Sequence, residues 1–234
     1  MTDIDYLKKY YDGPLEEALK QLEAGRPVQY IVGNVNFYGI NLKVNENVLI
    51  PRFETEELVD RIINYAKKQN KTLKIVDIGT GSGAIAITLK KKLNAKVTAT
   101  DISDAALEVA MENALVNDVQ IDFKLGNLLE PLNQKYDILV SNPPYIAYDE
   151  EIMEIVKNNE PHLALYAPNN GLYYYEEILK NVRNYLNEKA LIAFEIGEKQ
   201  GESIKELSLK YLGVEAKIEK DLQGRDRFAF IFLN

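Results

Sequence analysis

From residue 74 onward, short apolar segments alternate with segments of helical periodicity. The apolar segments are KIVDIG, KVTATDI, IDFKLG and YDILVSN, and the helical ones between the first three are AIAITLKKKL and DAALEVAMENALVN. Apolar strands that alternate with amphipathic helices predict βαβ units and therefore a largely parallel sheet with helices on both faces. We expect an α/β protein.

The C-terminal third adds three strands to this sheet. A helix around GLYYYEEILKNVRNYL precedes the strand ALIAFEIG, and a helix around SIKELSLKYL precedes AKIEKDL and FAFIFLN. Only the short QGRDR separates the last two strands, so we expect them to form a closing antiparallel hairpin. The complete expectation is a seven-stranded, mostly parallel, doubly wound sheet.

The first 50 residues have a different pattern. Residues 5–25 show helical spacing of leucine and alanine and predict a short helical arm. Residues 35–50 contain β-type residues interrupted by a glycine and by NEN, which predicts a hairpin. Thr55 is then expected to cap a helix over EELVDRIINYAKKQ. We divide the chain into an N-terminal arm and β-hairpin, 1–50, and a main domain, 51–234.

The composition narrows the classes of partner. There are 36 acidic and 28 basic residues, giving a net charge of −8, which disfavours direct binding of nucleic acid. Cysteine is absent and His162 is the only histidine, so we expect neither thiolate catalysis nor a metal site. No segment has the length or apolarity of a signal peptide or a membrane span. We expect a cytoplasmic protein.

A glycine-rich loop follows the first apolar strand. It contains Gly79, Thr80, Gly81, Ser82 and Gly83. Glycines between a strand and a helix allow a sharp turn and a close approach of the backbone to a ligand, although they also occur for packing alone. With Ala84, this loop also satisfies the pattern of dinucleotide-binding sites. We expect a nucleotide-like ligand here.

Two further positions could contact the same ligand. Asp101 ends the next strand, 22 residues after the first glycine of the loop, where a carboxylate can accept hydrogen bonds from both hydroxyls of a ribose. The alternative is that Asp101 caps the following helix. Asn127 could meet an adenine edge, with Leu128 beside the ring, and Asp77 could fix the glycine loop or accept from an ammonium group. NAD and S-adenosylmethionine both fit these residues.

The strand YDILVSN ends at the tetrapeptide Asn142, Pro143, Pro144 and Tyr145. Proline cannot donate to a strand ladder, so the strand must end there. If this strand lies beside the first one, Asn142 faces the glycine loop. Its amide oxygen and the neighbouring backbone carbonyl can hold both hydrogens of another NH₂ group.

A planar amide nitrogen is a poor nucleophile. Two acceptors that hold its hydrogens would favour the pyramidal form and direct its lone pair at a methyl sulfonium, by positioning and electrostatic preorganisation. Tyr145 would supply a flat wall for the group being methylated. The alternative is a rigid loop that only ends the strand. A dehydrogenase has no use for this arrangement, so the tetrapeptide favours a methyltransferase.

These motifs together resemble the release-factor glutamine methyltransferases. NPPY alone is shared with enzymes that methylate amino groups of DNA adenine and ribosomal RNA guanine, whereas the combination is more specific. The segments that carry the resemblance are GRPVQYIVGNVNFYG (25–39), LIPRFETEELVD (49–60), DIGTGSGAIAI (77–87), SNPPYI (141–146), NNEPHLALYAPNNGL (158–172) and EIGEKQG (195–201).

The resemblance implies an S-adenosylmethionine-dependent methyltransferase fold and methylation of the glutamine side chain in the Gly-Gly-Gln tip of peptide chain release factors. It implies that residues 79–83, Asp101 and Asn142 contact the methyl donor, that residues 142–145 hold the substrate glutamine, and that residues 49–52 form a lid.

Three features depart from the family. The N-terminal helical region is shorter, which is expected to reduce or alter contact with the partner. Phe53 replaces a common proline, and Asn127 replaces a common acid. Alternatives are a ribosomal-protein glutamine methyltransferase, a DNA or RNA amino-methyltransferase, and a non-catalytic module that binds an adenosine ligand.

Overall fold

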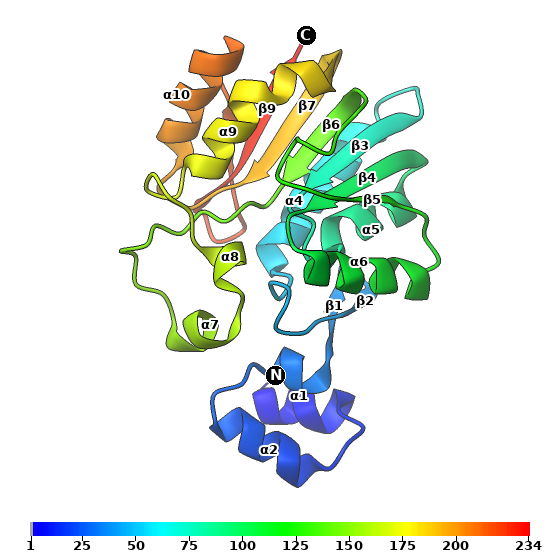
Figure 1. Cartoon of the computed structure of the whole chain (residues 1–234), viewed down its shortest axis with the longest axis vertical. Helices are drawn as coiled ribbons and strands as arrows, with labels where there is room; N and C mark the ends of the chain where they lie inside the picture. The colour runs from blue at the N-terminus through cyan, green and yellow to red at the C-terminus, as the bar shows by residue number, and fades with distance from the viewer. Residues whose placement is uncertain (1) are drawn as a thin grey trace.

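A computed structural model describes residues 2–234 and contains the expected seven-stranded sheet (Figure 1). Its strand order is β5-β4-β3-β6-β7-β9-β8. The first five strands of this order run parallel, and β9 is antiparallel to both β7 and β8, which confirms the closing hairpin. The strands are β3 (Leu73–Ile78), β4 (Ala95–Asp101), β5 (Asp122–Leu125), β6 (Tyr136–Ser141), β7 (Leu186–Glu195), β8 (Lys217–Lys220) and β9 (Asp226–Leu233).

Helices cover both faces of the sheet (Figure 1). On β3, Ile75 belongs to the hydrophobic cluster beneath α4 and α5, whereas Val76 and Ile78 belong to the cluster beneath α9 and α10. Successive side chains of a strand point to opposite faces, so a strand buried on both sides is mostly apolar. The helices on the two faces are α4 (Phe53–Ala66), α5 (Ala84–Lys92) and α6 (Asp104–Val116), then α9 (Tyr173–Asn181), continued by the 3-10 turn η1 (Val182–Tyr185), and α10 (Gly201–Leu212).

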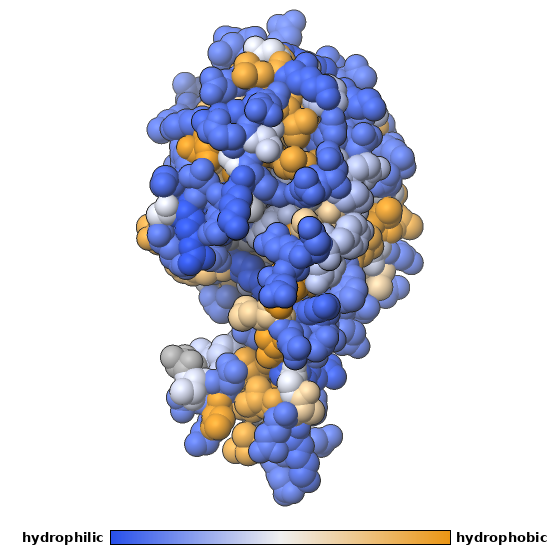
Figure 2. Space-filling view, turned by 90° about the vertical axis from the view of Figure 1, so that its left-hand side faces the viewer, coloured by the Kyte–Doolittle hydropathy of each residue, from blue (hydrophilic) through white to orange (hydrophobic). Residues whose placement is uncertain are grey.

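The N-terminal arm is a lobe of three short helices beyond one end of the sheet (Figures 1 and 2). These are α1 (Asp3–Tyr10), α2 (Leu15–Glu23) and α3 (Val28–Val32). Leu7, Ala18, Val28 and Ile31 form a hydrophobic cluster of their own. The arm therefore has a small core that is separate from the two main clusters.

The expected hairpin follows the arm. It consists of β1 (Asn34–Phe37) and β2 (Ile40–Lys43), which pair in antiparallel register. Tyr38 and Gly39 form its two-residue turn, both with positive φ, as such hairpin turns require. Phe37, Ile40 and Leu42 belong to the main hydrophobic cluster, so the hairpin connects the arm to the sheet domain.

The expectation that Thr55 caps a helix is wrong. Helix α4 begins at Phe53, with Arg52 at the N-cap position, and Thr55 lies within its first turn. The Thr55 side chain is buried and donates instead to the Glu195 carboxylate, at 2.7 Å. A tertiary partner that is buried beside the hydroxyl outweighs the local capping preference.

Two short helices between β6 and α9 have no counterpart in the sequence expectations. They are α7 (Glu154–Asn159) and α8 (His162–Leu165). Across residues 2–234, no helix combines the length and apolarity that crossing a bilayer requires.

Candidate active site

The pocket lies at the carboxyl ends of the central parallel strands. Strands β3 and β6 are neighbours, with Ile78 opposite Ser141 in the register. The glycine loop and Asn142 therefore start side by side, which confirms the expected strand order. Ligands of open α/β sheets bind where the strand order reverses in this way. The pocket is lined by the glycine loop, by residues that follow β4, β5 and β6, and by the segment 47–52.

The glycines of the loop have two different roles. Gly79 and Gly81 adopt positive φ, line the pocket, and have open space where a Cβ atom would stand. Gly83 does not line the pocket, and a Cβ there would lie 2.9 Å from Ile87 Cδ1 and 3.3 Å from Ala110 Cβ. Two glycines thus leave room for a ligand, whereas Gly83 allows the helices to pack.

Thr80 and Ser82 line the pocket with these glycines. The Thr80 hydroxyl donates to the Asp77 carboxylate at 2.7 Å. Asp77 is fully buried, and its burial raises the pKa of the carboxyl to about 7. Of the two roles considered for Asp77, the hydrogen bond from Thr80 supports the first, in which the carboxylate fixes the loop.

Asp101 reaches the pocket from the end of β4. One carboxylate oxygen accepts from the Gly81 N–H at 2.8 Å and the other from the Ser103 N–H at 2.9 Å. Burial raises the pKa of Asp101 above its usual value. Ser103, not Asp101, occupies the N-cap position of α6, where its hydroxyl accepts from the Ala106 N–H. The capping alternative for Asp101 is therefore wrong.

Asn127 and Leu128 follow β5 and line the same pocket. Leu128 has a positive φ of 49°, and its carbonyl accepts from the Thr100 hydroxyl at 3.3 Å. The preceding Gly126 N–H donates to the Asp101 carbonyl at 2.9 Å. These bonds tie the loop after β5 to the end of β4 and place both residues beside Asp101.

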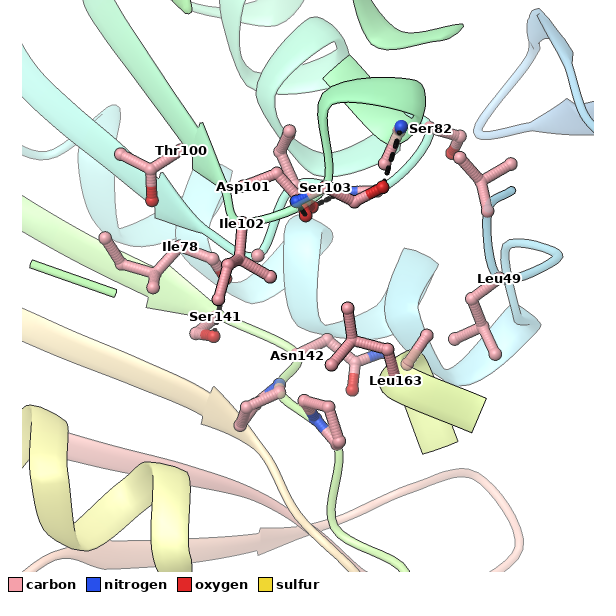
Figure 3. Close-up of a pocket in the computed structure, with 18 of the residues that line it drawn as sticks. Leu49, Ile78, Ser82, Thr100, Asp101, Ile102, Ser103, Ser141, Asn142 and Leu163 are labelled. Carbon is pink, nitrogen blue, oxygen red and sulfur yellow. Dashed lines mark hydrogen bonds between the residues drawn. The ribbon is translucent and has the colours of Figure 1, made fainter. Parts of the chain in front are cut away.

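Asn142 approaches the pocket from the side opposite Asp101 (Figure 3). Its Nδ2 donates to the Thr55 hydroxyl at 3.2 Å, and Thr55 in turn donates to Glu195. Pro143 and Pro144 line the pocket after Asn142. The structure thus brings the ends of β3, β4 and β6 together around one cavity.

Tyr145 lies apart from this pocket, in a second pocket that adjoins it. Asn142, Pro143, Arg52 and Glu195 also line that second pocket, so Asn142 and Pro143 belong to both. Burial raises the pKa of the Tyr145 phenol, which keeps it neutral. A neutral aromatic ring can act as an apolar wall, as the sequence suggests.

The segment LIPR is anchored by a residue that sequence patterns do not single out. The buried Glu160 carboxylate accepts from the Ile50 N–H at 3.1 Å and from Arg52 Nη2 at 2.6 Å. Leu49 and Arg52 line both pockets. The segment therefore lies over the junction of the two cavities and is held to the region just before α8.

Thr55 and Glu195 are also not identified as site residues by the sequence analysis. They lie within LIPRFETEELVD and EIGEKQG, so the family resemblance contains a signal for both. Their hydrogen-bond partners lie far away in the sequence, and no local spacing reveals them.

Gly171 holds the tetrapeptide in place by its lack of a side chain. It has a φ of 80°, and a Cβ there would overlap the Tyr145 carbonyl oxygen and lie 2.6 Å from Gln200 Nε2. Gln200 Nε2 donates to this same carbonyl at 3.0 Å. The backbone after Asn142 is thus fixed by a close contact that only glycine permits.

Gly171→Ala is expected to destabilise the protein by about 1–3 kcal/mol more than Gly213→Ala, because overlap with the Tyr145 carbonyl is added to backbone strain. Gly213 is the matched control, since it has a φ of 69° but open space at its Cβ position. Urea unfolding of both variants measures the difference. Equal losses of unfolding free energy in the two variants would show that the close contact at Gly171 does not affect stability.

Comparison with known proteins identifies relatives over about nine-tenths of the chain. The methyltransferase small domain family matches residues 56–164. A release factor glutamine methyltransferase of Streptococcus pneumoniae is 45% identical over 222 residues, which is 93% of this chain and 78% of the relative. The enzyme of the same name from Flavobacterium psychrophilum is 47% identical over 91% of this chain and 77% of its own length.

Solved structures share the fold at lower identity. A ribosomal protein L11 methylase from Lactobacillus delbrueckii subsp. bulgaricus has a TM-score of 0.59 at 24% identity, covering 77% of this chain and 79% of that one. A 16S rRNA N2 G1207 methyltransferase from Thermus thermophilus, in complex with AdoMet and guanosine, has a TM-score of 0.63 at 13% identity, covering 86% and 50%. These likenesses establish the methyltransferase fold.

Proposed function

The chain belongs to the release factor glutamine methyltransferases, and we propose that it uses S-adenosylmethionine to methylate the side-chain amide of the glutamine in the Gly-Gly-Gln motif of a peptide chain release factor. Kinship over nine-tenths of the chain supports the reaction. The observation that carries the assignment of residues is the position of Asn142, which lines both the glycine-loop pocket and the second pocket beside it.

The glycine-loop pocket fits the donor. The open Cβ positions of Gly79 and Gly81 leave room for a ligand against the backbone. The Asp101 carboxylate, at the edge of the same loop, can accept from ribose hydroxyls, and Asn127 and Leu128 can meet the adenine. When bound, S-adenosylmethionine supplies a methyl carbon attached to a positively charged sulfur, which a nitrogen lone pair can displace.

The second pocket suits the glutamine side chain. Asn142 Nδ2 is occupied by Thr55, so its Oδ1 is the atom left to accept from the substrate NH₂ group. The backbone carbonyl next to Pro143 can accept the second hydrogen, and Tyr145 forms an apolar wall. These residues would orient the nitrogen lone pair toward the methyl carbon of the bound donor. A carbon–nitrogen bond would then form as the carbon–sulfur bond breaks, and the amide nitrogen would release one proton to water.

Asn142 and its neighbours therefore act by orientation and by electrostatic preorganisation. Residues 49–52 lie over the junction of the two pockets and can exclude water from it. We assign residues 51–234 as the catalytic domain and residues 1–50 as the arm and hairpin that contact the release factor. We place the reaction in the cytoplasm, where release factors act on ribosomes.

Methyl transfer is expected to be confined to the release factor. The protein is incubated with labelled S-adenosylmethionine and, separately, with a release factor, with ribosomal proteins and with unmethylated DNA. Label should appear in the release factor only, and a release factor with asparagine in place of the motif glutamine should stay unlabelled, because its shorter side chain does not reach Asn142. Label in ribosomal proteins or DNA, with none in the release factor, would contradict the proposal.

A further inference from the structure

We propose that Glu195 is a positioning residue that, through Thr55, fixes which end of the Asn142 carboxamide faces the substrate nitrogen. This inference rests on the proposed function, since it concerns the same pocket. Glu195 itself need not touch the reacting atoms. Its role is to keep the Asn142 oxygen, rather than the NH₂ group, directed at the amide that is methylated.

The three residues form a hydrogen-bonded chain from three separate parts of the fold. Thr55 belongs to α4, Asn142 follows β6, and Glu195 ends β7. Asn142 Nδ2 donates to Thr55 Oγ1 at 3.2 Å, and Thr55 Oγ1 donates to Glu195 Oε2 at 2.7 Å. Thr55 is 4% exposed and Glu195 1% exposed, so bulk water does not compete for these bonds.

The chemistry of the groups gives this chain a direction. An ionised carboxylate can only accept hydrogen bonds, so the Thr55 hydroxyl must donate its single hydrogen to Glu195. The Thr55 oxygen is then left as an acceptor and selects the NH₂ end of Asn142. The Asn142 oxygen must consequently face away from Thr55, toward the pocket, where it can accept from a substrate NH₂ group.

Protonation of Glu195 would remove this direction. A neutral carboxyl could donate to Thr55, the hydroxyl could then donate to Asn142 Oδ1, and the carboxamide could turn its NH₂ end toward the pocket. Two NH₂ groups would then face each other, and neither could accept. The substrate nitrogen would lose the acceptor that orients its lone pair.

Glu195 is held in a setting that makes its ionisation state sensitive to pH. Burial raises the pKa of its carboxyl to about 7, opposed by the hydrogen bond from Thr55. The two cations that act on it pair with other carboxylates, Arg52 with Glu160 and Arg227 with Asp221. The charged and titratable groups that face Glu195 are Arg52 and Glu54 at the start of α4, Tyr145 after β6, Tyr175 on α9 and Arg227 on β9.

This setting also argues against a role in stability alone. A buried carboxylate without an ion-pair partner of its own is costly, and a neutral residue of the same shape is usually tolerated at least as well. No ion pair among residues 2–234 includes Glu195. A residue that only filled space at this position would serve better as glutamine.

The variants Glu195→Gln, Thr55→Val and Thr55→Ser test the proposal. At pH 8, Glu195→Gln and Thr55→Val should each lower kcat for release factor methylation about tenfold or more, the scale of one misdirected hydrogen bond. KM for the release factor and Kd for the donor should change less than about threefold, because the pockets keep their shape. Thr55→Ser keeps the hydroxyl and should restore most of kcat.

The pH profile separates positioning from packing. In the native protein, kcat should rise as pH increases through about 7. The ionised Glu195 carboxylate is the form that fixes the direction of the hydrogen bonds made by Thr55 and Asn142. Glu195→Gln should remove this rise. Asp77→Asn tests the second buried carboxyl with a pKa of about 7. Because Asp77 holds the glycine loop through Thr80, this variant is compared at saturating donor, where kcat should keep the rise.

Unchanged kcat in both Glu195→Gln and Thr55→Val would overturn the proposal, as would a Thr55→Ser variant as slow as Thr55→Val. Circular dichroism identifies any variant that fails to fold, and the remaining one then decides. Failure of the proposed function looks different, because the native protein itself would then leave the release factor unlabelled.

Discussion

Asn142→Ala is expected to lower kcat at least about a hundredfold, the scale of removing one preorganised polar contact from an active site. Asn142 lines both pockets, and in the proposed mechanism its Oδ1 accepts from the substrate NH₂ group. Alanine leaves the glycine loop and Asp101 untouched, so the Kd for the donor should change less than about threefold.

Single-turnover methylation gives the rate, and calorimetry gives the donor affinity. Asn64→Ala is the matched control, because Asn64 lies on α4 with its amide bonded to Asp60 at the surface, away from both pockets. Native turnover in Asn142→Ala would show that the tetrapeptide only ends β6.

Asp101→Ala is expected to weaken donor binding about tenfold to a hundredfold, since hydrogen bonds to a charged group are worth about 1.5–3 kcal/mol. The effect has two sources, because in our proposal Asp101 accepts from the ribose hydroxyls of the donor, and its carboxylate also accepts from the Gly81 N–H. At saturating donor, kcat should fall much less, because Asn142 and the second pocket are unchanged.

Isothermal titration with S-adenosylmethionine measures this loss. Asp104→Ala is the control, since Asp104 lies three residues away in the first turn of α6 and does not line the pocket. Equal donor affinity in Asp101→Ala and the native protein would mean that the carboxylate only shapes the loop.

The sheet could be predicted because its signal is local. Strands β3 and β6 are buried on both faces, so they appear in the sequence as mostly apolar segments, and helices of clear periodicity lie between β3, β4 and β5. The short helices α7 and α8 could not be predicted in this way. They have 6 and 4 residues, too few to show a helical period.

The candidate site could likewise be predicted only where its signal is local. The glycine loop, Asp101 and Asn142 each end or follow a strand, so their meeting follows from the strand order. The partners of Asn142 do not follow from it. Thr55 is 87 residues from Asn142 and 140 from Glu195, and Glu160 is 110 residues from Ile50.

Local sequence patterns also predicted an incorrect role for Thr55 and an incomplete one for Gly83, and the structure shows why. Thr55 has the composition of an N-cap, but a buried carboxylate competes for its hydroxyl. Gly83 belongs to the glycine pattern, but its missing Cβ serves contact with Ile87 and Ala110. In both cases a tertiary neighbour, absent from the local sequence, decides what the residue does.

The central claim is that the methyl donor and the substrate glutamine meet at Asn142. A crystal structure with S-adenosylhomocysteine and a Gly-Gly-Gln peptide would test this claim most directly. We expect the adenosyl group to lie on the glycine loop with its ribose at Asp101, and the glutamine nitrogen to lie between the sulfur and Asn142 Oδ1. An adenosyl group bound outside this pocket, or a glutamine side chain that does not reach Asn142, would contradict it.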